Sequence, residues 1–341
     1  KRYCQYYYSL YRAKCLIWMT TNYKDIITIL GEEIPLGKSK EINFNIAKLH
    51  SSTKIEVPVI INRSKKPGPT ILITAGLHGD EINGIDIVRQ IISRGINKPK
   101  KGTIICIPVI NIFGFLHMER ELPDGRDLNR MFPGSKSGAL ASQVAFKLMT
   151  EIVPQVDLII DYHTGGADRF NAPQIRIIED EPVLDELATI FGAPFILYSK
   201  NINKSFRNAC YKIGVPILLF EGGKSFSFDR NVTNTAVNGA KRILNHLEML
   251  NPKFKVSKPK KQSVYISKSK WIRAKYSGMF KASVALNTYI KKGDIIGNIT
   301  DPYGKFNHFI KAEYSGYAFS INESPIVYKG DALIHVSIEL D

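Results

Sequence analysis

The chain has few cysteines, and none of them are paired in a motif. Its 341 residues include four cysteines, and no two of these form a Cys-x-x-Cys pair. Cys106 lies within an apolar run that is typical of a buried strand. This usage excludes a disulfide framework and indicates reduced, buried thiols in a cytoplasmic protein.

Long apolar runs are also missing. No stretch approaches the ~18–20 consecutive apolar residues of a membrane span, so we expect no membrane partner. Residues 1–18 are basic and rich in tyrosine, but they lack the apolar core of a secretory signal. Since the chain starts with Lys1, we expect Met19 to be the natural first residue and residues 1–18 to be a non-native or disordered extension.

Acidic residues are absent from two stretches that carry much of the positive charge. The net charge is +16, and residues 1–18 and 252–275 together hold 13 basic side chains and no acid. The rest of the chain is therefore close to neutral. A basic surface would favour nucleic-acid binding, whereas a basic tail and a basic linker are typical of solvated spacers. We therefore expect no nucleic-acid partner.

What is present has the composition of a folded protein, with 44% hydrophobic and 23% charged residues, and a length that suits one large and one small domain. Apolar runs of strand length alternate with amphipathic segments, which predicts an α/β fold with a mostly parallel or mixed sheet and flanking helices. The expected strands are 41–62 (a hairpin or meander at the sheet edge), 70–75, 103–110, 156–162, 194–198 and 216–220, and the expected helices are 81–94, 139–153, 182–191, 206–213 and 234–250.

The pattern changes after the last expected helix. We expect a catalytic domain over residues 19–251, a basic linker over 252–264 and an all-β accessory domain over 265–341. Glycines punctuate short strands in the last segment, and its Lys-Gly-Asp turn at residues 292–294 recurs at residues 329–331. This repeat resembles the barrel-sandwich fold of biotinyl and lipoyl carriers. The Met-Lys-Met motif of those carriers is missing, so the segment is expected to be an accessory module.

Two of the expected buried strands lead to histidines. Residues 70–75 are followed by His78, with Glu81 three residues later, and residues 156–162 are followed by His163. Each histidine alone could be a hydrogen-bonded core residue. The carboxyl ends of parallel strands, however, meet at one edge of a sheet. Two histidines and one glutamate are the ligands of a hydrolytic zinc site with a position open for water, so the sequence predicts one Zn²⁺ per chain, which fits better than other divalent ions.

Two further carboxylates stand at strand ends. Glu221 follows the expected strand 216–220 and is placed to take a proton from water and pass it to a leaving amine. Otherwise it is a surface glutamate at a turn. Asp161 precedes His163 by two residues and could orient the free ring nitrogen of that histidine. A solvated strand end and the opposite face of the strand are the alternatives for Asp161.

A polar loop carries three arginines, Arg120, Arg126 and Arg130. Arginine suits recognition of a carboxylate, and Arg120 or Arg126 could stabilise an oxyanion. Composition alone favours exposed arginines that pair with Asp124 and Asp127.

The order of these motifs resembles the succinylglutamate desuccinylase/aspartoacylase family of the zinc carboxypeptidase superfamily. His-Gly-Asp-Glu at residues 78–81 is followed by Asp-Leu-Asn-Arg at residues 127–130, a strand-end histidine and a strand-end glutamate. The resemblance spans roughly residues 40–250 and implies a zinc-carboxypeptidase-like fold with a small all-β, barrel-sandwich-like C-terminal domain. It implies zinc ligation by His78, Glu81 and His163, catalysis by Glu221, binding of the substrate carboxylate by Asn129 and Arg130, and polarisation of the carbonyl by Arg120 or, alternatively, Arg126.

Together these patterns predict a zinc-dependent amidohydrolase acting on linear amides, carbon–nitrogen bonds other than peptide bonds. Its substrate would be a small N-acyl amino acid or a related amide that bears a carboxylate. One alternative is a carboxypeptidase-type peptidase, which uses the same chemistry in a more open cleft. Another is a non-catalytic binding module built from the basic linker and the β segment, against which the intact catalytic set argues. The sequence leaves the acyl group, the amino acid and a homo-oligomeric state open.

Overall fold

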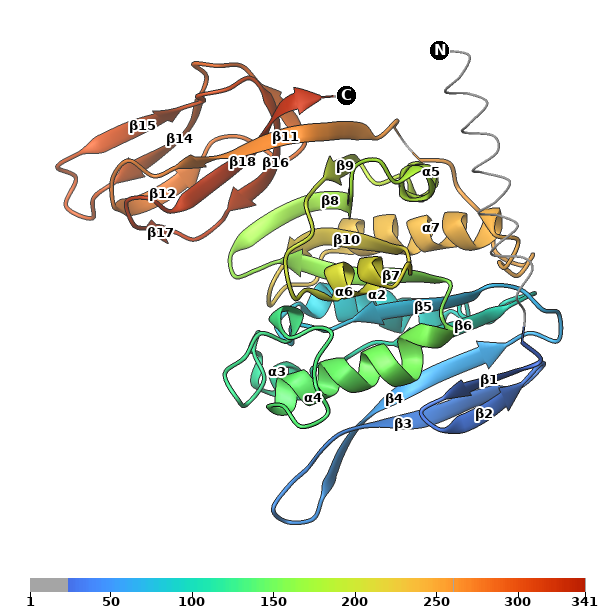
Figure 1. The fold of residues 1–341 in the computed structure, drawn as a ribbon. Coiled ribbons are helices and arrows are strands. Elements are labelled where there is room, and N and C mark those ends of the chain that lie inside the picture. Colours follow the sequence, from blue (N-terminus) through green and yellow to red (C-terminus); the bar gives the residue numbers. More distant parts are fainter. Residues whose placement is uncertain (1–23, 260, 341) are drawn as a thin grey trace.

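A mixed 12-stranded sheet forms the centre of the molecule in the computed structural model, which describes residues 24–259 and 261–340 (Figure 1). The expected extension 1–18 and the expected start at Met19 lie outside the described residues. The strand order is β13-β16-β18-β11-β9-β8-β10-β7-β5-β6-β4-β3. The N-terminal part supplies β3 (Ser39–Lys48), β4 (Lys54–Arg63), β5 (Thr70–Ala75), β6 (Thr103–Ile107), β7 (Leu158–Gly165), β8 (Arg169–Ile177), β9 (Phe195–Tyr198) and β10 (Ile217–Lys224).

Strand pairing is parallel in the middle of the sheet, where β6, β5, β7 and β10 lie side by side. The β3–β4 hairpin is antiparallel and ends the sheet at the β3 edge, as expected for residues 41–62. A separate two-stranded ribbon is formed by β1 (Ile26–Ile29) and β2 (Glu32–Pro35). The expected α/β class with a mixed sheet and flanking helices is confirmed.

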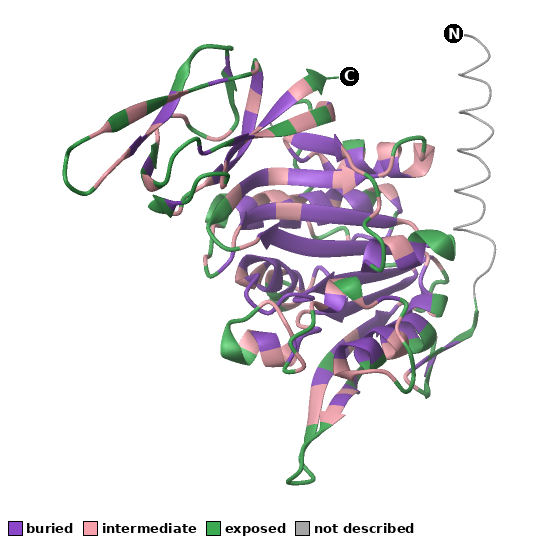
Figure 2. Cartoon of the chain, turned by 60° about the vertical axis from the view of Figure 1, so that its left-hand side comes forward, coloured by how far each residue is buried: buried purple, intermediate pink, exposed green. Residues whose placement is uncertain are grey.

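Helices cover both faces of the sheet because its central strands are apolar on both sides. In β5, Ile71 and Ile73 belong to one hydrophobic core and Leu72 to the other. Figure 2 shows the buried residues concentrated in these central strands. The first core includes side chains of α2 (Ile82–Ser93), α5 (Pro182–Phe191) and α7 (Arg230–His246), and the second includes side chains of α4 (Leu140–Lys147) and α6 (Phe206–Lys212).

Several segments differ from the sequence-based expectation. The helix expected at 234–250 is α7, which begins at Arg230 and ends at His246, and α3 (Ile112–His117) was not expected. The expected helix 139–153 is α only as far as Lys147 and continues as a π turn (Leu148–Ile152) and a 3-10 turn (Val153–Gln155). Pro154 lies in this last turn, and a proline cannot continue an α-helix because it lacks an amide hydrogen. Residues 169–177, for which no strand was expected, form β8, which lies between β10 and β9. Polar side chains interrupt the apolar pattern of β8.

The described residues that follow α7 form strands only. β11 pairs in parallel with β9, and β16 pairs with β8, so the main sheet continues into this C-terminal part (Figure 1). A second sheet has the order β15-β14-β12-β17. The strands are β11 (Val264–Arg273), β12 (Gly278–Ala282), β13 (Thr288–Ile290), β14 (Ile295–Thr300), β15 (Asn307–Lys311), β16 (Gly316–Asn322), β17 (Ile326–Val327) and β18 (Ala332–Leu340).

Within the part of the chain that the structure describes, no helix has both the length and the hydropathy needed to cross a lipid bilayer.

Candidate active site

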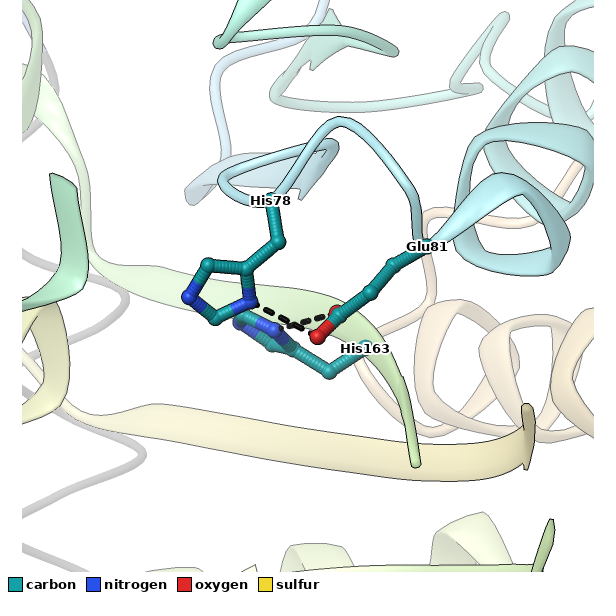
Figure 3. Close-up of side chains that lie close together, drawn as sticks. All are labelled: His78, Glu81 and His163. Carbon is teal, nitrogen blue, oxygen red and sulfur yellow. Dashed lines mark hydrogen bonds and ion pairs between the residues drawn. The ribbon is translucent and has the colours of Figure 1, made fainter. Parts of the chain in front are cut away.

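Three buried side chains converge at the carboxyl ends of β5 and β7. His78 follows β5, Glu81 immediately precedes α2, and His163 lies in β7 (Figure 3). Their ligand-type atoms all lie within 4.8 Å of one another. The Nδ1 atoms of His78 and His163 are 2.7 and 2.8 Å from the two carboxylate oxygens of Glu81. The structure therefore brings together the three residues that the sequence analysis assigned to zinc.

Close backbone packing holds Glu81 beside His163. A Cβ atom at Gly84, in the first turn of α2, would stand only 2.8 Å from the carbonyl oxygen of Tyr162. Glycine therefore lets the start of this helix approach β7 directly. The backbone amide of Thr164 donates a hydrogen bond to Glu81 Oε2 at 3.1 Å, which fixes the carboxylate against the same strand.

Each histidine has a second carboxylate on its other ring nitrogen. His163 Nε2 lies 2.9 Å from Asp161 Oδ2, and Thr74 Oγ1 donates to the other oxygen of Asp161 at 2.8 Å. His78 Nε2 lies 3.2 Å from Asp127 Oδ1. A carboxylate on Nε2 keeps the proton there and leaves the Nδ1 lone pair for a cation, an arrangement common in zinc sites. Of the three positions left open for Asp161, the structure shows the one that contacts His163.

These contacts alter the pKa values of the cluster. Burial alone would lower the pKa of His78 and of His163, but the adjacent carboxylates outweigh burial and raise both. Burial would raise the pKa of Glu81, yet the two imidazoles lower it strongly. The carboxylates that raise the pKa values of the two imidazoles carry negative charge that also attracts a divalent cation. Two imidazole nitrogens and one carboxylate fit Zn²⁺ in their donor chemistry.

Arg120 lies beside this cluster and Arg126 does not. The Arg120 guanidinium donates to Asp127 Oδ2 at 2.9 Å and lies 3.5 Å from Glu81 Oε1. Burial would lower the pKa of Arg120, but Asp127 and Glu81 raise it, so the charge is permanent. Arg126 contacts the backbone oxygen of Asp124 at 3.3 Å and is not part of the cavity lining.

Asn129 and Arg130 occupy a 3-10 turn, Leu128–Arg130, at the rim of the cavity. Asn129 Oδ1 accepts a hydrogen bond from the backbone amide of Phe206 at 2.8 Å, so this side chain also holds the start of α6. The Arg130 guanidinium donates to the Asn129 carbonyl at 2.8 Å and lies 3.9 Å from Asp127. It remains largely open to the cavity for an anionic ligand.

Glu221 lies in β10, directly across from His163 of β7 in the strand register. The strand extends past Glu221 to Lys224, so this residue is not at a turn. Two side chains of β8 hold its carboxylate: Asn171 Nδ2 donates to Oε2 at 2.6 Å, and the Arg176 guanidinium lies 3.2 Å from Oε1. Neither Asn171 nor Arg176 was assigned a role from the sequence.

Arg207 is a further cavity residue that the sequence analysis missed. It lies in α6, is 7% exposed, and donates to Ser199 Oγ at 3.0 Å and to the backbone oxygen of Lys200 at 2.9 Å. Burial and the nearby Arg176 guanidinium lower the pKa of Arg207 to about 10, which still leaves it charged at neutral pH. The signal available in the sequence was the position of Arg207 on the same helix face as the apolar residues of α6 that are buried.

The cavity over the cluster has a volume of about 710 Å³. Positive charge predominates in its lining even before a divalent cation is added. Five arginines, Arg120, Arg130, Arg169, Arg176 and Arg207, oppose four carboxylates, Asp80, Glu81, Asp127 and Glu221. Such a cavity favours an anionic ligand.

The chain is similar in sequence and in fold to several known proteins. The chain is 27% identical over 259 residues to the N-alpha-acetyl-L-2,4-diaminobutyric acid deacetylase of Halomonas elongata, a match that covers 72% of this chain and 75% of the relative. The structure superposes on the product-bound ectoine utilization protein EutE (DoeB) of Ruegeria pomeroyi with a TM-score of 0.77, at 20% identity, covering 93% and 100% of the two chains.

A succinylglutamate desuccinylase/aspartoacylase from Rhodobacter sphaeroides matches with a TM-score of 0.76, at 21% identity, and covers 89% of this chain and 96% of its own. At these identities the structural matches show a shared fold. The family model of the succinylglutamate desuccinylase/aspartoacylase catalytic domain matches residues 67–247, more than half of the chain. These residues include the whole His78–Glu81–His163 cluster and Glu221, and the chain belongs to the succinylglutamate desuccinylase/aspartoacylase family.

Proposed function

We propose that this protein is a zinc-dependent amidohydrolase that removes the acyl group from an N-acyl amino acid or a related small amide bearing a carboxylate. The observation that carries the proposal is the buried His78–Glu81–His163 cluster, in which His163 lies across the strand register from Glu221. The family membership and the deacetylase relative support the same class of reaction.

One zinc ion per chain, held by His78, Glu81 and His163, would supply a Lewis acid that lowers the pKa of a water molecule and polarises a carbonyl group. Asp127 and Asp161 keep the two imidazole rings oriented for this role. The donor set supports this proposal because both Nδ1 atoms face the Glu81 carboxylate.

Glu221 takes the proton from the attacking water and delivers it to the leaving amine. Its carboxylate is held in place by Asn171 and Arg176, so little reorganisation is needed between the two proton transfers. Arg120, beside Glu81, donates hydrogen bonds to the oxyanion that develops when the acyl carbonyl is attacked. Asn129 and Arg130 bind the carboxylate of the substrate.

The excess of arginines in the cavity supports a small anionic substrate. We further propose that the enzyme works in the cytoplasm. Cys106 and Cys210 support this, since both are buried free thiols, as is usual in a reducing compartment.

The test is amine release from a panel of N-acyl amino acids that varies the acyl group (acetyl, succinyl, formyl) and the charge of the amine. Chelator-sensitive turnover by protein that holds one zinc per chain is the expected result. Cleavage of peptide C-termini, with every N-acyl amino acid inert, would instead establish the carboxypeptidase-type alternative.

A further inference from the structure

Two aromatic side chains from the C-terminal strands line the same cavity as the His78–Glu81–His163 cluster. They are Trp271 of β11 and His335 of β18. The two residues are direct cross-strand partners, and their rings stack with centroids 4.4 Å apart at an interplanar angle of 12°. Phe319 of β16 packs against His335, with ring centroids also 4.4 Å apart. We call Trp271 and His335 the aromatic wall.

The aromatic wall is fixed to the catalytic part of the molecule by backbone pairing. β11 continues the main sheet beside β9, and β16 pairs with β8 through Ser320 and Asn171. Asn171 is one of the two residues that hold Glu221. The position of the wall relative to Glu221 therefore depends on strand register and not on a flexible tether.

The aromatic wall is uncharged, whereas charged side chains surround the His78–Glu81–His163 cluster in the same cavity. Burial, helped by the Arg176 guanidinium, lowers the pKa of His335 to about 3, so the ring is neutral at physiological pH. Other apolar side chains in the cavity lining include Ile202 and Phe226, which are 50% and 54% exposed. In the proposed mechanism, the charged residues of the cavity bind the carboxylate and act on the amide of the substrate. They leave the apolar side chains of the lining without a role.

The cavity is also larger than a minimal substrate requires. Its volume of about 710 Å³ lies in the range of pockets that enclose drug-sized ligands, roughly 300–1,000 Å³. An N-acetylated small amino acid would leave the aromatic wall in contact with water.

On the basis of the proposed deacylase function, we propose that Trp271, stacked on His335, binds an apolar group of the substrate, so that the preferred substrates are N-acyl amino acids with an apolar extension beyond acetyl. The extension belongs either to the acyl half, as an aliphatic or aromatic acyl group, or to the amine half, as an apolar amino-acid side chain. In both cases the aromatic wall contacts an apolar group of the substrate.

Binding can be measured without turnover because the chain contains only two tryptophans, Trp18 and Trp271. In a Trp18→Phe protein loaded with zinc, the fluorescence reports on Trp271 alone. Titration with straight-chain carboxylates from acetate to hexanoate, and with free amino acids from glycine to norleucine, should change this fluorescence. We expect Kd to fall by about fourfold for each methylene that reaches the wall, in one of the two series. Equal Kd values along both series would overturn the proposal.

The kinetic test uses two matched substrate series. One varies the acyl chain from acetyl to hexanoyl on a single amino acid, and the other keeps acetyl and varies the amino-acid side chain. In the unaltered enzyme, kcat/KM should rise by about fourfold per methylene in one series, mainly through KM. Trp271→Ala should flatten that rise, and Trp271→Phe should restore part of it.

Tyr276→Ala is the matched control. Tyr276 is an exposed aromatic residue of the C-terminal part that also stacks on a histidine, with its ring centroid 4.0 Å from that of His308, but it lines a different cavity. This variant should keep the slope of the unaltered enzyme. Zinc content and Tm are measured for every variant, so a misfolded Trp271→Ala protein is recognised and Trp271→Phe then carries the test.

The outcomes separate this inference from the proposed function. No amine release from any substrate, with chain-length-dependent quenching of Trp271, would reject the deacylase and keep the apolar subsite. Amine release with the same slope in Trp271→Ala and in the unaltered enzyme would keep the deacylase and reject the subsite. A preference for a succinyl over a butyryl substrate that Trp271→Ala leaves unchanged, together with no rise along the amino-acid series, would also reject it.

Discussion

At the scale of single residues, the site depends on neighbours that fix the orientation of each reactive group. Both carboxylate oxygens of Glu221 contact side chains of β8. His78 and His163 each have a carboxylate in contact with Nε2. Reactivity at such a site is sensitive to changes that preserve shape but remove charge or a proton acceptor.

Glu221→Gln keeps the size of the side chain, but it can accept a hydrogen bond from only one of its two donors, Asn171 or Arg176, and it cannot accept the proton of water. We expect kcat to fall by about 10²–10⁴-fold while zinc content stays at one per chain. Turnover assays paired with metal analysis check this, with Glu248→Gln as a surface control because the Glu248 side chain is 70% exposed. Activity close to that of the unaltered enzyme would remove Glu221 from the mechanism.

The two arginines that the sequence left as alternatives can be separated in the same assay. Arg120→Ala removes a donor beside Glu81, and loss of one oxyanion donor reduces kcat by about 10²–10³-fold. Arg126→Ala removes a guanidinium that contacts only Asp124 in the described residues, so its effect should be far smaller. The reverse order of effects would assign the carbonyl-polarising role to Arg126.

At the scale of secondary-structure elements, close packing of α2 on β7 brings Glu81 to the histidines. The contact is made at Gly84, whose Cα faces the Tyr162 carbonyl. We therefore expect the position of Glu81 relative to His78 and His163 to depend on a glycine at position 84.

Gly84→Ala places a methyl group at 2.8 Å from this carbonyl oxygen, so α2 must shift away from β7. We expect a loss of roughly 1–3 kcal/mol in the free energy of unfolding and weaker zinc binding, since Glu81 moves with the helix. Denaturant unfolding and a zinc competition assay measure the two effects. Ser93→Ala, at the exposed end of the same helix, is the control. Unchanged zinc affinity in a destabilised Gly84→Ala protein would show that the helix position does not set the site.

Which elements could be predicted from the sequence follows from how local their signals are. The strand 70–75 and the helix 182–191 match the structure residue for residue, because continuous apolar runs and helical periodicity lie within each segment. The strand β8 was missed because Asn171 and Arg176 face the site and interrupt its apolar pattern. Asp127 was seen only as a partner for loop arginines, since its contact with His78 spans 49 residues of the chain.

At the scale of the whole molecule, the cluster ties together segments that are distant in the sequence. A bound cation would link the end of β5, the start of α2 and β7, so its binding energy adds to the stability of the folded chain.

The pH dependence of that added stability has a definite sign. In the metal-free chain, the raised pKa values of His78 and His163 stabilise the fold below the ordinary histidine pKa of about 6.5, and this contribution is lost as the pH rises through the raised values. Zinc requires the deprotonated Nδ1 atoms and competes with these protons. The rise in Tm on adding zinc should therefore grow as the pH is raised from about 6 to about 8.

Thermal unfolding with and without zinc at several pH values checks this expectation. Magnesium at the same concentration is the control, because it prefers oxygen ligands and does not suit two imidazoles. A zinc-induced shift that is constant or that shrinks as the pH rises would contradict the assignment of His78 and His163 as ligands.

The unbroken hydrogen bonding from β9 to β11 has a consequence for how this protein can be divided. A chain cut after residue 251 would leave β9 as a bare edge, with the backbone groups that now pair with Val264–Ile266 open to other molecules. Such a fragment would be prone to self-association, however well its catalytic residues were preserved. The parts before and after residue 251 can therefore be exchanged between relatives, in evolution or in the laboratory, only where the incoming C-terminal part carries a strand that fits β9 in the same register.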